Sequence, residues 1–263
     1  MNKIKVSAVS YLNTLPFVHG LNQSGFIHKL ALSLDAPSEC ARRLMAGEAD
    51  VGLVPVAVIP QLKYAEIISE YCIGADGKID SVSVMSQVPL DKIKTILLDY
   101  ESRTSALLIR ILAEQQWKIE PEILYALEGF EKNISGNTAG LVIGNRALLL
   151  KNKFRFEYDL AAEWKKMTGL PFVFACWVCN GKLSGDFIKE FNNALRYGIS
   201  RIENLFDASL EPEIPRSAQR NYLKNSVSYI LDKQKEKGMK KFLELAGAFK
   251  SGSVISTEKN IIS

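Results

Sequence analysis

Histidine is nearly absent from this chain of 263 residues, in which only His19 and His28 occur. His19 falls in the apolar start of a predicted helix and His28 in a predicted strand. Catalytic sets of the Ser–His–Asp or Cys–His type, and most clusters of metal ligands, need histidine beside a second reactive group. The sequence offers no such set and no metal-ligand cluster. If the protein is an enzyme, it works without the usual base, and no metal or other cofactor is expected.

Long hydrophobic runs and a strong charge of either sign are also missing. No stretch reaches the roughly 18 apolar residues of a membrane span, and the first residues, MNKIKVSAVSYLN, show no apolar leader with a cleavage site. Lysine and arginine total 33 against 29 aspartate and glutamate, a net charge of +4, which is too mild to argue for nucleic acid or membrane. The basic stretch Lys233–Lys241 is interrupted by Glu236 and is typical of a solvated helix face. The expected location is the cytoplasm, with no nucleic-acid or membrane partner.

Cysteine is scarce, and its arrangement does not favour redox chemistry. Two of the four cysteines, Cys176 and Cys179, form a C-x-x-C match. Redox pairs of this type normally open a helix, whereas this pair lies within PFVFACWVCN, a strand-like run. Residues three apart on a strand point to opposite faces. Buried apolar thiols are therefore the preferred interpretation.

The hydrophobic pattern that is present alternates between strands and helices, which predicts an α/β fold with mainly parallel pairing. Ser38 is the expected cap of one helix and Gly47 its stop signal. Strands are predicted over residues 3–9, 29–34, 51–54, 65–74, 81–87, 95–100, 122–127, 139–144 and 170–180, and helices near Pro16 and over 38–45, 59–62, 103–115, 145–152, 159–169, 184–205, 217–232 and 234–249.

Two lobes are predicted because a complete strand–helix unit is enclosed between two strands. Lobe 1 is expected to comprise residues 1–87 and 175–263, and lobe 2 residues 88–174. The chain would cross between them at 81–87 and at 172–179, which makes a hinge with a central cleft. Ligands of open α/β sheets bind beyond the carboxyl ends of strands. The loops of interest are therefore 10–14, 54–57, 99–105 and 143–145.

The loop DYESRTS, where a predicted strand leads into a helix, gathers three hydroxyls and a guanidinium from Ser102, Arg103, Thr104 and Ser105. A helix start needs only one cap. Unpaired backbone N–H groups, hydroxyl donors and an arginine together make a cradle for a carboxylate or phosphate. A carboxylate is preferred, because no glycine-rich phosphate loop is present. The alternative is a capped helix with Arg103 on the surface.

Three further segments carry candidate ligand-binding residues. Asn13 and Thr14 follow the first strand, where the asparagine amide can donate to or accept from a hydroxyl or carboxylate; ordinary turn chemistry is the alternative. Gly144 permits close approach of the backbone, and Asn145 is either a helix cap or a ligand contact. The remaining candidates are Pro55, in the loop at 54–57, and Ser81 and Ser83, on the first crossing strand.

Four motifs, SYLNTLPF (10–17), GEADVGLVPV (47–56), SRTSALL (102–108) and TGLPFVFACW (168–177), together resemble the menaquinone-biosynthesis family of chorismate dehydratases. The resemblance follows the family's order over about the whole chain. It implies a two-lobed fold like a type II periplasmic binding protein. It also implies a cofactor-independent hydro-lyase of the futalosine route, which removes water from chorismate, a dicarboxylate, to give 3-[(1-carboxyvinyl)oxy]benzoate.

By the same resemblance, Asn13 and Ser81 correspond to active-site residues, and Ser102–Ser105 to the position that binds a substrate carboxylate. One departure is visible, because the family commonly has aspartate after the glycine of IGD, where this chain has Asn145. No protein base is evident, so the substrate's own side-chain carboxylate is the expected proton acceptor. Asn13 and Ser81 would orient groups and hydrogen-bond developing charge.

Two other interpretations stay open. One is a non-catalytic solute-binding or sensor protein of the same fold that takes a small anion. The other is the sister enzyme of the route, which makes 1,4-dihydroxy-6-naphthoate and depends on a cleft histidine, whereas His19 and His28 lie outside the predicted loops. In each case the partner is a small molecule, and the chain is expected to act alone or as a homodimer.

Overall fold

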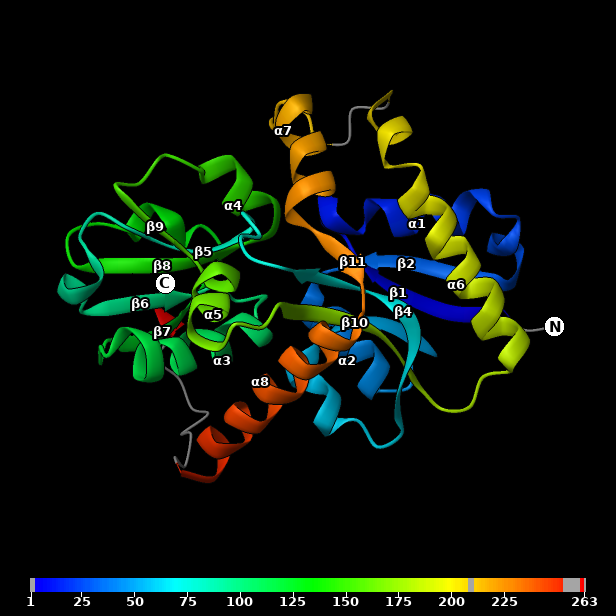
Figure 1. The fold of residues 1–263 in the computed structure, drawn as a ribbon, viewed down its shortest axis with the longest axis horizontal. Coiled ribbons are helices and arrows are strands. Elements are labelled where there is room, and N and C mark those ends of the chain that lie inside the picture. Colours follow the sequence, from blue (N-terminus) through cyan, green and yellow to red (C-terminus); the bar gives the residue numbers. More distant parts are fainter. Residues whose placement is uncertain (1–2, 208–210, 253–260, 263) are drawn as a thin grey trace. The chain divides into compact units, whose positions relative to one another are not determined.

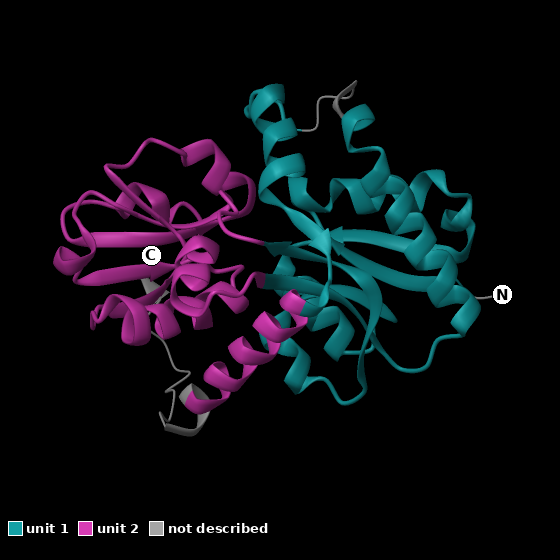
Figure 2. Cartoon of the chain, in the orientation of Figure 1, with its two compact units in different colours: residues 1–75, 173–233 teal, residues 76–172, 234–263 magenta. Residues whose placement is uncertain are grey.

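The computed structural model describes residues 3–207, 211–252 and 261–262. The chain forms two compact units (Figure 2), residues 1–75 with 173–233 and residues 76–172 with 234–263. We refer to them as unit 1 and unit 2. Each has its own mixed β-sheet with helices packed against it (Figure 1). The predicted α/β class is confirmed.

The sheet of unit 1 has the strand order β11-β4-β10-β3-β1-β2. β1 runs parallel to β2 and β3, whereas β10 is antiparallel to β3. The continuous apolar run VGLVP of β3 is buried throughout, as expected for a central strand covered on both faces. Because β1 and β3 are parallel and Ser7 lies opposite Gly52, the carboxyl ends of these two strands lie side by side. The strands are β1 (Ile4–Val9), β2 (Leu30–Asp35), β3 (Val51–Pro55), β4 (Ala65–Ala75), β10 (Phe172–Asn180) and β11 (Ser228–Ile230).

Glycines allow helices α1 and α6 to pack closely on one another in unit 1. A Cβ atom at Gly20 would lie 2.0 Å from the carbonyl oxygen of Ala194, and one at Gly198 would lie 1.8 Å from that of Pro16. Neither position can accept a side chain. The helices are α1 (Leu15–Gln23), α2 (Pro37–Met45), α6 (Gly185–Ser200) and α7 (Arg216–Asn221), with the 3-10 helices η1 (Leu12–Thr14), η2 (Phe26–Lys29), η3 (Val56–Gln61) and η7 (Ile202–Asp207) and the π-helical turn η8 (Tyr222–Ser226).

The sheet of unit 2 has the strand order β12-β7-β6-β8-β5-β9. β6 is parallel to β7 and β8, and β5 is antiparallel to β8 and β9. The strands are β5 (Val82–Ser86), β6 (Thr95–Leu98), β7 (Glu122–Ala126), β8 (Thr138–Ile143), β9 (Phe156–Asp159) and β12 (Ile261–Ile262).

Helix α5 of unit 2 begins where the Asp159 carboxylate accepts hydrogen bonds from the backbone N–H groups of Ala161 and Ala162, a normal N-cap. Trp164 of α5 packs against Phe242 of α8, with ring centroids 6.3 Å apart. The helices are α3 (Thr104–Leu112), α4 (Gly144–Leu150), α5 (Leu160–Thr168) and α8 (Lys233–Gly252), with the 3-10 helices η4 (Leu90–Lys92) and η6 (Phe130–Asn133) and the π-helical turn η5 (Ala113–Trp117).

The division of the chain differs in places from the sequence-based expectation. β5 belongs to the sheet of unit 2, so the first crossing precedes this strand, and α8 groups with unit 2. Both sheets contain parallel pairs, as expected, and each also contains antiparallel pairs, because β10 runs against β3 and β5 runs against β8 and β9. The predicted ranges 1–87 with 175–263 also include residues outside the described part of the chain.

Two local predictions in unit 1 are wrong. Ser38 lies inside α2, whose N-cap is Ala36 without a side-chain hydrogen bond; Pro37 at the first position suits this start, because its ring fixes φ and its missing N–H would be unpaired anyway. His28 lies in the 3-10 helix η2 and not in a strand.

Three short strands were not predicted from the hydrophobic pattern. Residues 228–230 form β11 within a segment predicted as helix, and β9 (156–159) and β12 (261–262) were not predicted as strands. Two to four residues are too few to establish a period of two. Among the described residues, no helix is long and apolar enough to cross a membrane.

Candidate ligand-binding site

Within unit 2, three predicted segments meet at one edge of the sheet. β6 and β8 are parallel, with Leu98 opposite Leu141, so their carboxyl ends lie side by side. β5 is antiparallel to β8 and begins at the same edge, where Val82 pairs with Ile143. This is the edge at which α/β sheets bind ligands. It carries Ser81, the loop 99–105 and Gly144–Asn145.

A main-chain hydrogen bond links Ser81 and Gly144: the Gly144 N–H donates to the Ser81 carbonyl oxygen at 2.8 Å. Gly144 has φ +65°, a conformation that favours glycine, and it opens α4. The N-cap of α4 is Ile143 and makes no side-chain hydrogen bond, so the interpretation of Asn145 as a cap is wrong. Ser81 and Ser83 are both buried. Ligand contact by Asn145 stays a prediction.

Helix α3 begins without the side-chain cap that its hydroxyls could supply. Its N-cap is the exposed Arg103, which makes no capping hydrogen bond, and its first turn contains no acidic residue. The hydroxyl of Ser102 is buried and has no hydrogen-bond partner. Leaving a buried hydroxyl unpaired costs about 1–3 kcal/mol, and such groups are rare enough to need an explanation. The helix end therefore presents N–H groups, partial positive charge and an unused hydroxyl.

An ion-pair network holds the loop after β6 against the start of α4. Asp99 is fully buried, and Arg146 Nη2 donates to its carboxylate at 2.7 Å. Arg146 also pairs with Glu131 at 2.8 Å and lies over the ring of Tyr100, 4.9 Å from its centroid. Burial raises the pKa of Asp99 to about 6, against the opposing effects of Arg146 and of the backbone N–H of Glu101.

Unit 1 carries the other predicted residues at the edge where β1 and β3 end. Asn13 and Thr14 belong to η1, directly after β1, and Pro55 is the last residue of β3. The Thr14 hydroxyl donates to Asn13 Oδ1 at 3.2 Å, and Asn13 Nδ2 donates to the Tyr222 hydroxyl at 3.1 Å. The Tyr229 hydroxyl donates to the main-chain carbonyl of Asn13 at 3.0 Å. Both ends of the Asn13 carboxamide are thus held.

The two tyrosines and the Asp99–Arg146 pair were not found by sequence reasoning. Tyr222 and Tyr229 lie 209 and 216 residues beyond Asn13, and no local pattern connects segments so far apart. A signal did exist for Asp99, because a carboxylate directly after the apolar strand TILL needs a buried partner.

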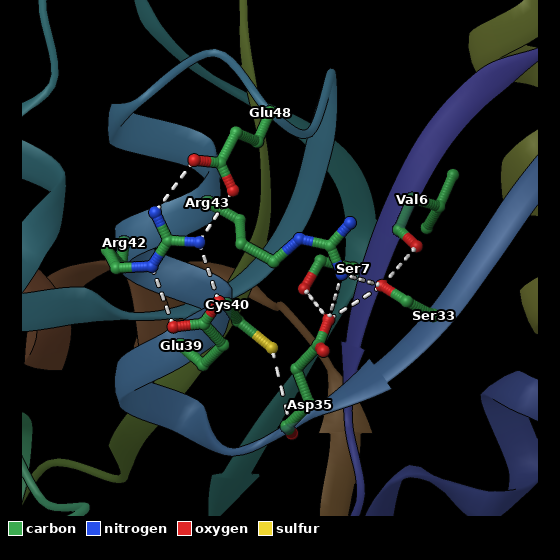
Figure 3. Close-up of polar contacts among 9 residues, drawn as sticks. All are labelled: Val6, Ser7, Ser33, Asp35, Glu39, Cys40, Arg42, Arg43 and Glu48. Carbon is green, nitrogen blue, oxygen red and sulfur yellow. Dashed lines mark hydrogen bonds and ion pairs between the residues drawn. The ribbon is translucent and has the colours of Figure 1, made fainter.

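A second polar group in unit 1, the Asp35 cluster, consists of Ser7, Ser33, Asp35 and Arg43 (Figure 3). The Asp35 carboxylate accepts from the hydroxyls of Ser7 at 2.7 Å and Ser33 at 2.6 Å, and from Arg43 at 2.8 Å. Burial opposes ionisation, but these hydrogen bonds outweigh it and lower the pKa of Asp35. The donors converge on a protein carboxylate, so the cluster ties β1, β2 and α2 together.

The cysteines confirm the sequence-based interpretation. Cys40, Cys72, Cys176 and Cys179 are free and buried. Cys176 and Cys179 lie on β10, and burial raises the pKa of both thiols, which makes them poor nucleophiles. Among the described residues, no group of three or more His, Cys, Asp and Glu side chains is placed to hold a metal ion.

The fold is that of the periplasmic binding proteins. A conserved Candida albicans gene product with the generic periplasmic binding protein fold matches with a TM-score of 0.62 and 14% identity, over 94% of this chain and 91% of its own. The alkanesulfonate-binding protein SsuA from Xanthomonas axonopodis pv. citri has a TM-score of 0.66 and 14% identity, over 95% and 94%. Protein AF1704 from Archaeoglobus fulgidus has a TM-score of 0.72 and 19% identity, over 95% and 98%. At such identities the likeness shows the fold alone.

Sequence similarity defines the family within this fold. Residues 4–248 match the family of menaquinone biosynthesis proteins, and the chain belongs to this family. A chorismate dehydratase from Thermus thermophilus is 26% identical over 90% of this chain and 93% of its own length. The resemblance carried by the four sequence motifs is thereby confirmed.

Proposed function

We propose that the protein is a chorismate dehydratase, a carbon–oxygen lyase that removes water from chorismate to give 3-[(1-carboxyvinyl)oxy]benzoate. The observation that carries this proposal is the 26% identity with the chorismate dehydratase of Thermus thermophilus over 90% of the chain. Membership of the menaquinone-biosynthesis family agrees with it.

The start of α3 suits one of the two carboxylates of chorismate. A carboxylate accepts hydrogen bonds and carries no donor, and this helix end offers donors with no acidic residue in its first turn. The Ser102 hydroxyl lacks a protein acceptor, and Arg103 is exposed beside it. A charge-assisted hydrogen bond would satisfy the hydroxyl and anchor the substrate.

The reaction depends more on how the substrate is oriented than on a strongly acidic or basic group of the protein. One ring C–H bond and the C–O bond of the hydroxyl break, a ring C=C bond forms, and the proton and the hydroxide leave as one water molecule. The ring becomes aromatic, which makes the elimination favourable. The substrate's own side-chain carboxylate accepts the proton, while Asn13 and Ser81 orient the ring and hydrogen-bond the charge that develops.

The other assigned roles follow from this proposal. Thr14, Pro55, Ser83, Gly144 and Asn145 are proposed substrate contacts in addition to the loop Ser102–Ser105. Three further statements stay predictions: the enzyme needs no cofactor, it acts in the cytoplasm, and it forms a homodimer.

The purified protein should convert chorismate in a buffer that contains a chelator. The ultraviolet spectrum should change as the ring becomes aromatic, and mass spectrometry should find one product that is lighter by one water. Loss of activity on chelation would contradict the cofactor-free mechanism but not the proposal that the protein dehydrates chorismate.

The same experiment separates the two alternatives. A solute-binding or sensor protein would bind chorismate, seen by calorimetry, without changing its spectrum. The sister synthase would leave chorismate unchanged and is expected to use a histidine. In this chain, His19 lies on α1 with its ring stacked at 6.2 Å on Tyr197 of α6, and His28 lies in η2, so neither follows the carboxyl end of a strand.

A further inference from the structure

The carboxamide of Asn13 is more firmly held than a side chain at the end of a strand needs to be. A primary amide has two N–H donors and two acceptor lone pairs. Thr14 uses one lone pair of Oδ1 and the phenol of Tyr222 accepts one N–H. One N–H and one lone pair are left to face a ligand.

The χ2 torsion, which rotates the plane of this amide, has only weak conformational preferences of its own. The terminal torsion of asparagine joins an sp³ to an sp² carbon, and its energy wells are broad and roughly two-fold. Two hydrogen bonds on opposite ends of the amide plane remove that freedom. Because Tyr222 and Thr14 are 3% and 0% exposed, water cannot readily replace these partners. Their geometry thus decides which N–H points outward.

Tyr222 is placed by a local irregularity of the backbone. Helix α7 ends at Asn221 and continues as the π-helical turn Tyr222–Ser226, closed by a hydrogen bond from the Val227 N–H to the Tyr222 carbonyl at 3.1 Å. Such turns are rare and concentrate at functional sites. The strand β11 follows at once (Figure 1) and carries Tyr229, whose hydroxyl holds the Asn13 main chain. One short segment therefore fixes both the backbone and the side chain of Asn13.

We propose that Tyr222 is a positioning residue for the dehydration: its phenol oxygen orients the Asn13 carboxamide so that the remaining N–H meets the substrate. The proposal rests on the proposed function of Asn13. Tyr222 acts through Asn13, so its effect should vanish when the Asn13 side chain is removed.

A double-mutant cycle tests this dependence. The variants are Tyr222→Phe, Asn13→Ala and the double variant, assayed for kcat and KM with chorismate. Tyr222→Phe keeps the ring and its packing but deletes the acceptor. A neutral hydrogen bond lost in this way should lower kcat about 3- to 10-fold with KM within about twofold. In the Asn13→Ala background, the same change should alter kcat by less than about twofold.

Tyr158→Phe is the matched control, because the Tyr158 hydroxyl accepts a hydrogen bond from the Leu90 N–H in unit 2, and neither residue is a proposed site residue. It should leave kcat unchanged. An equal loss from Tyr222→Phe in both backgrounds, or no loss in either, would overturn the positioning role. Absence of turnover in the wild-type protein would instead defeat the proposed function from which this role derives.

Discussion

The Asp35 cluster and the start of α3 have similar residues and different states of pairing. Each combines serine hydroxyls with an arginine close to a helix. In the Asp35 cluster, two hydroxyls and the guanidinium converge on one carboxylate. At α3 the Ser102 hydroxyl is buried with no partner and the helix has no side-chain cap. A polar group whose hydrogen bonds are satisfied internally stabilises the fold, whereas a buried group without a protein partner needs an explanation, and at the start of α3 the proposed explanation is a ligand.

The largest expected effect comes from the residues proposed to touch the reacting groups. Asn13→Ala and Ser81→Ala should each lower kcat about 100- to 1000-fold, by analogy with the loss of one preorganised donor to a developing charge. KM should change far less, because the interaction is strongest in the transition state. Steady-state kinetics on chorismate measure both constants. Ser33→Ala, in the Asp35 cluster, serves as the control and should turn over at the wild-type rate.

Ser102→Ala should separate affinity from stability. Losing a hydroxyl that hydrogen-bonds a charged group costs about 1.5–3 kcal/mol, so calorimetry should show chorismate binding at least about tenfold weaker. The melting temperature should stay the same or rise, since the variant no longer buries an unpaired hydroxyl. Unchanged affinity would mean that the start of α3 is not the carboxylate site.

Asp35→Asn should have the opposite profile. The side chains of Asp35 and Arg43 are 17% and 26% exposed, so solvent screens the pair, and the variant should lose about 1–2 kcal/mol of unfolding free energy with no loss of affinity. The folded pKa of Asp35 lies below 3.8. Its contribution is therefore complete above about pH 4 and is lost as the pH falls further. Denaturant titrations at several pH values would show whether the variant lacks this acid-sensitive part.

Asp99 should make the unfolding free energy depend on pH in the direction opposite to that of Asp35. Its folded pKa of about 6 lies above the unfolded value of 3.8, so between these values the folded state holds a proton that the unfolded state has released. Its contribution to the unfolding free energy should fall as the pH rises from about 4 to about 6, by at most about 1.4 kcal/mol per pH unit. In Asp99→Asn this slope should disappear, which urea titrations across the range can detect. A slope identical to that of the wild type would assign the effect to other groups.

The smallest effect is expected from the thiols. Cys176→Ala with Cys179→Ala should leave kcat nearly unchanged in reducing and in oxidising buffer, because both thiols are buried with raised pKa values. Some stability should be lost with the buried sulfur atoms. A fall in turnover without a fall in melting temperature would reopen the C-x-x-C interpretation.

Much of the fold could be predicted because hydrophobic period and turn residues are local properties. The strands at KIKVSAV and TILL and the helix at SALLIRIL were predicted on this basis, and the loops that follow these strands gave candidate residues. The order of the strands could not be predicted in the same way. That β10 lies between β4 and β3 depends on residues more than 100 positions apart, and no periodicity encodes that choice.

The partners of the site residues escaped prediction for the same reason. Asn13 could be selected from its place after a strand, but its attachment to Tyr222 depends on a π-helical turn, for which sequence has no established signal. Ser102 was selected as a candidate from composition alone, and its role stays a prediction. That its hydroxyl makes no capping hydrogen bond could not be read from the sequence, because the N-cap of α3 is Arg103 and not one of the neighbouring hydroxyl residues.

The place of β10 in its sheet has a consequence for biosynthesis. A ribosome that has made β1, β2, β3 and β4 has made no strand to pair with the free side of β3, and the whole of residues 76–172 has to be synthesised before β10 emerges. At about 5–20 residues per second this takes many seconds, during which β3, an apolar strand, presents an open edge to other nascent chains. Unit 2, whose residues 76–172 are contiguous, can collapse first, and a chaperone that shields β3 in the interval should raise the yield of folded protein.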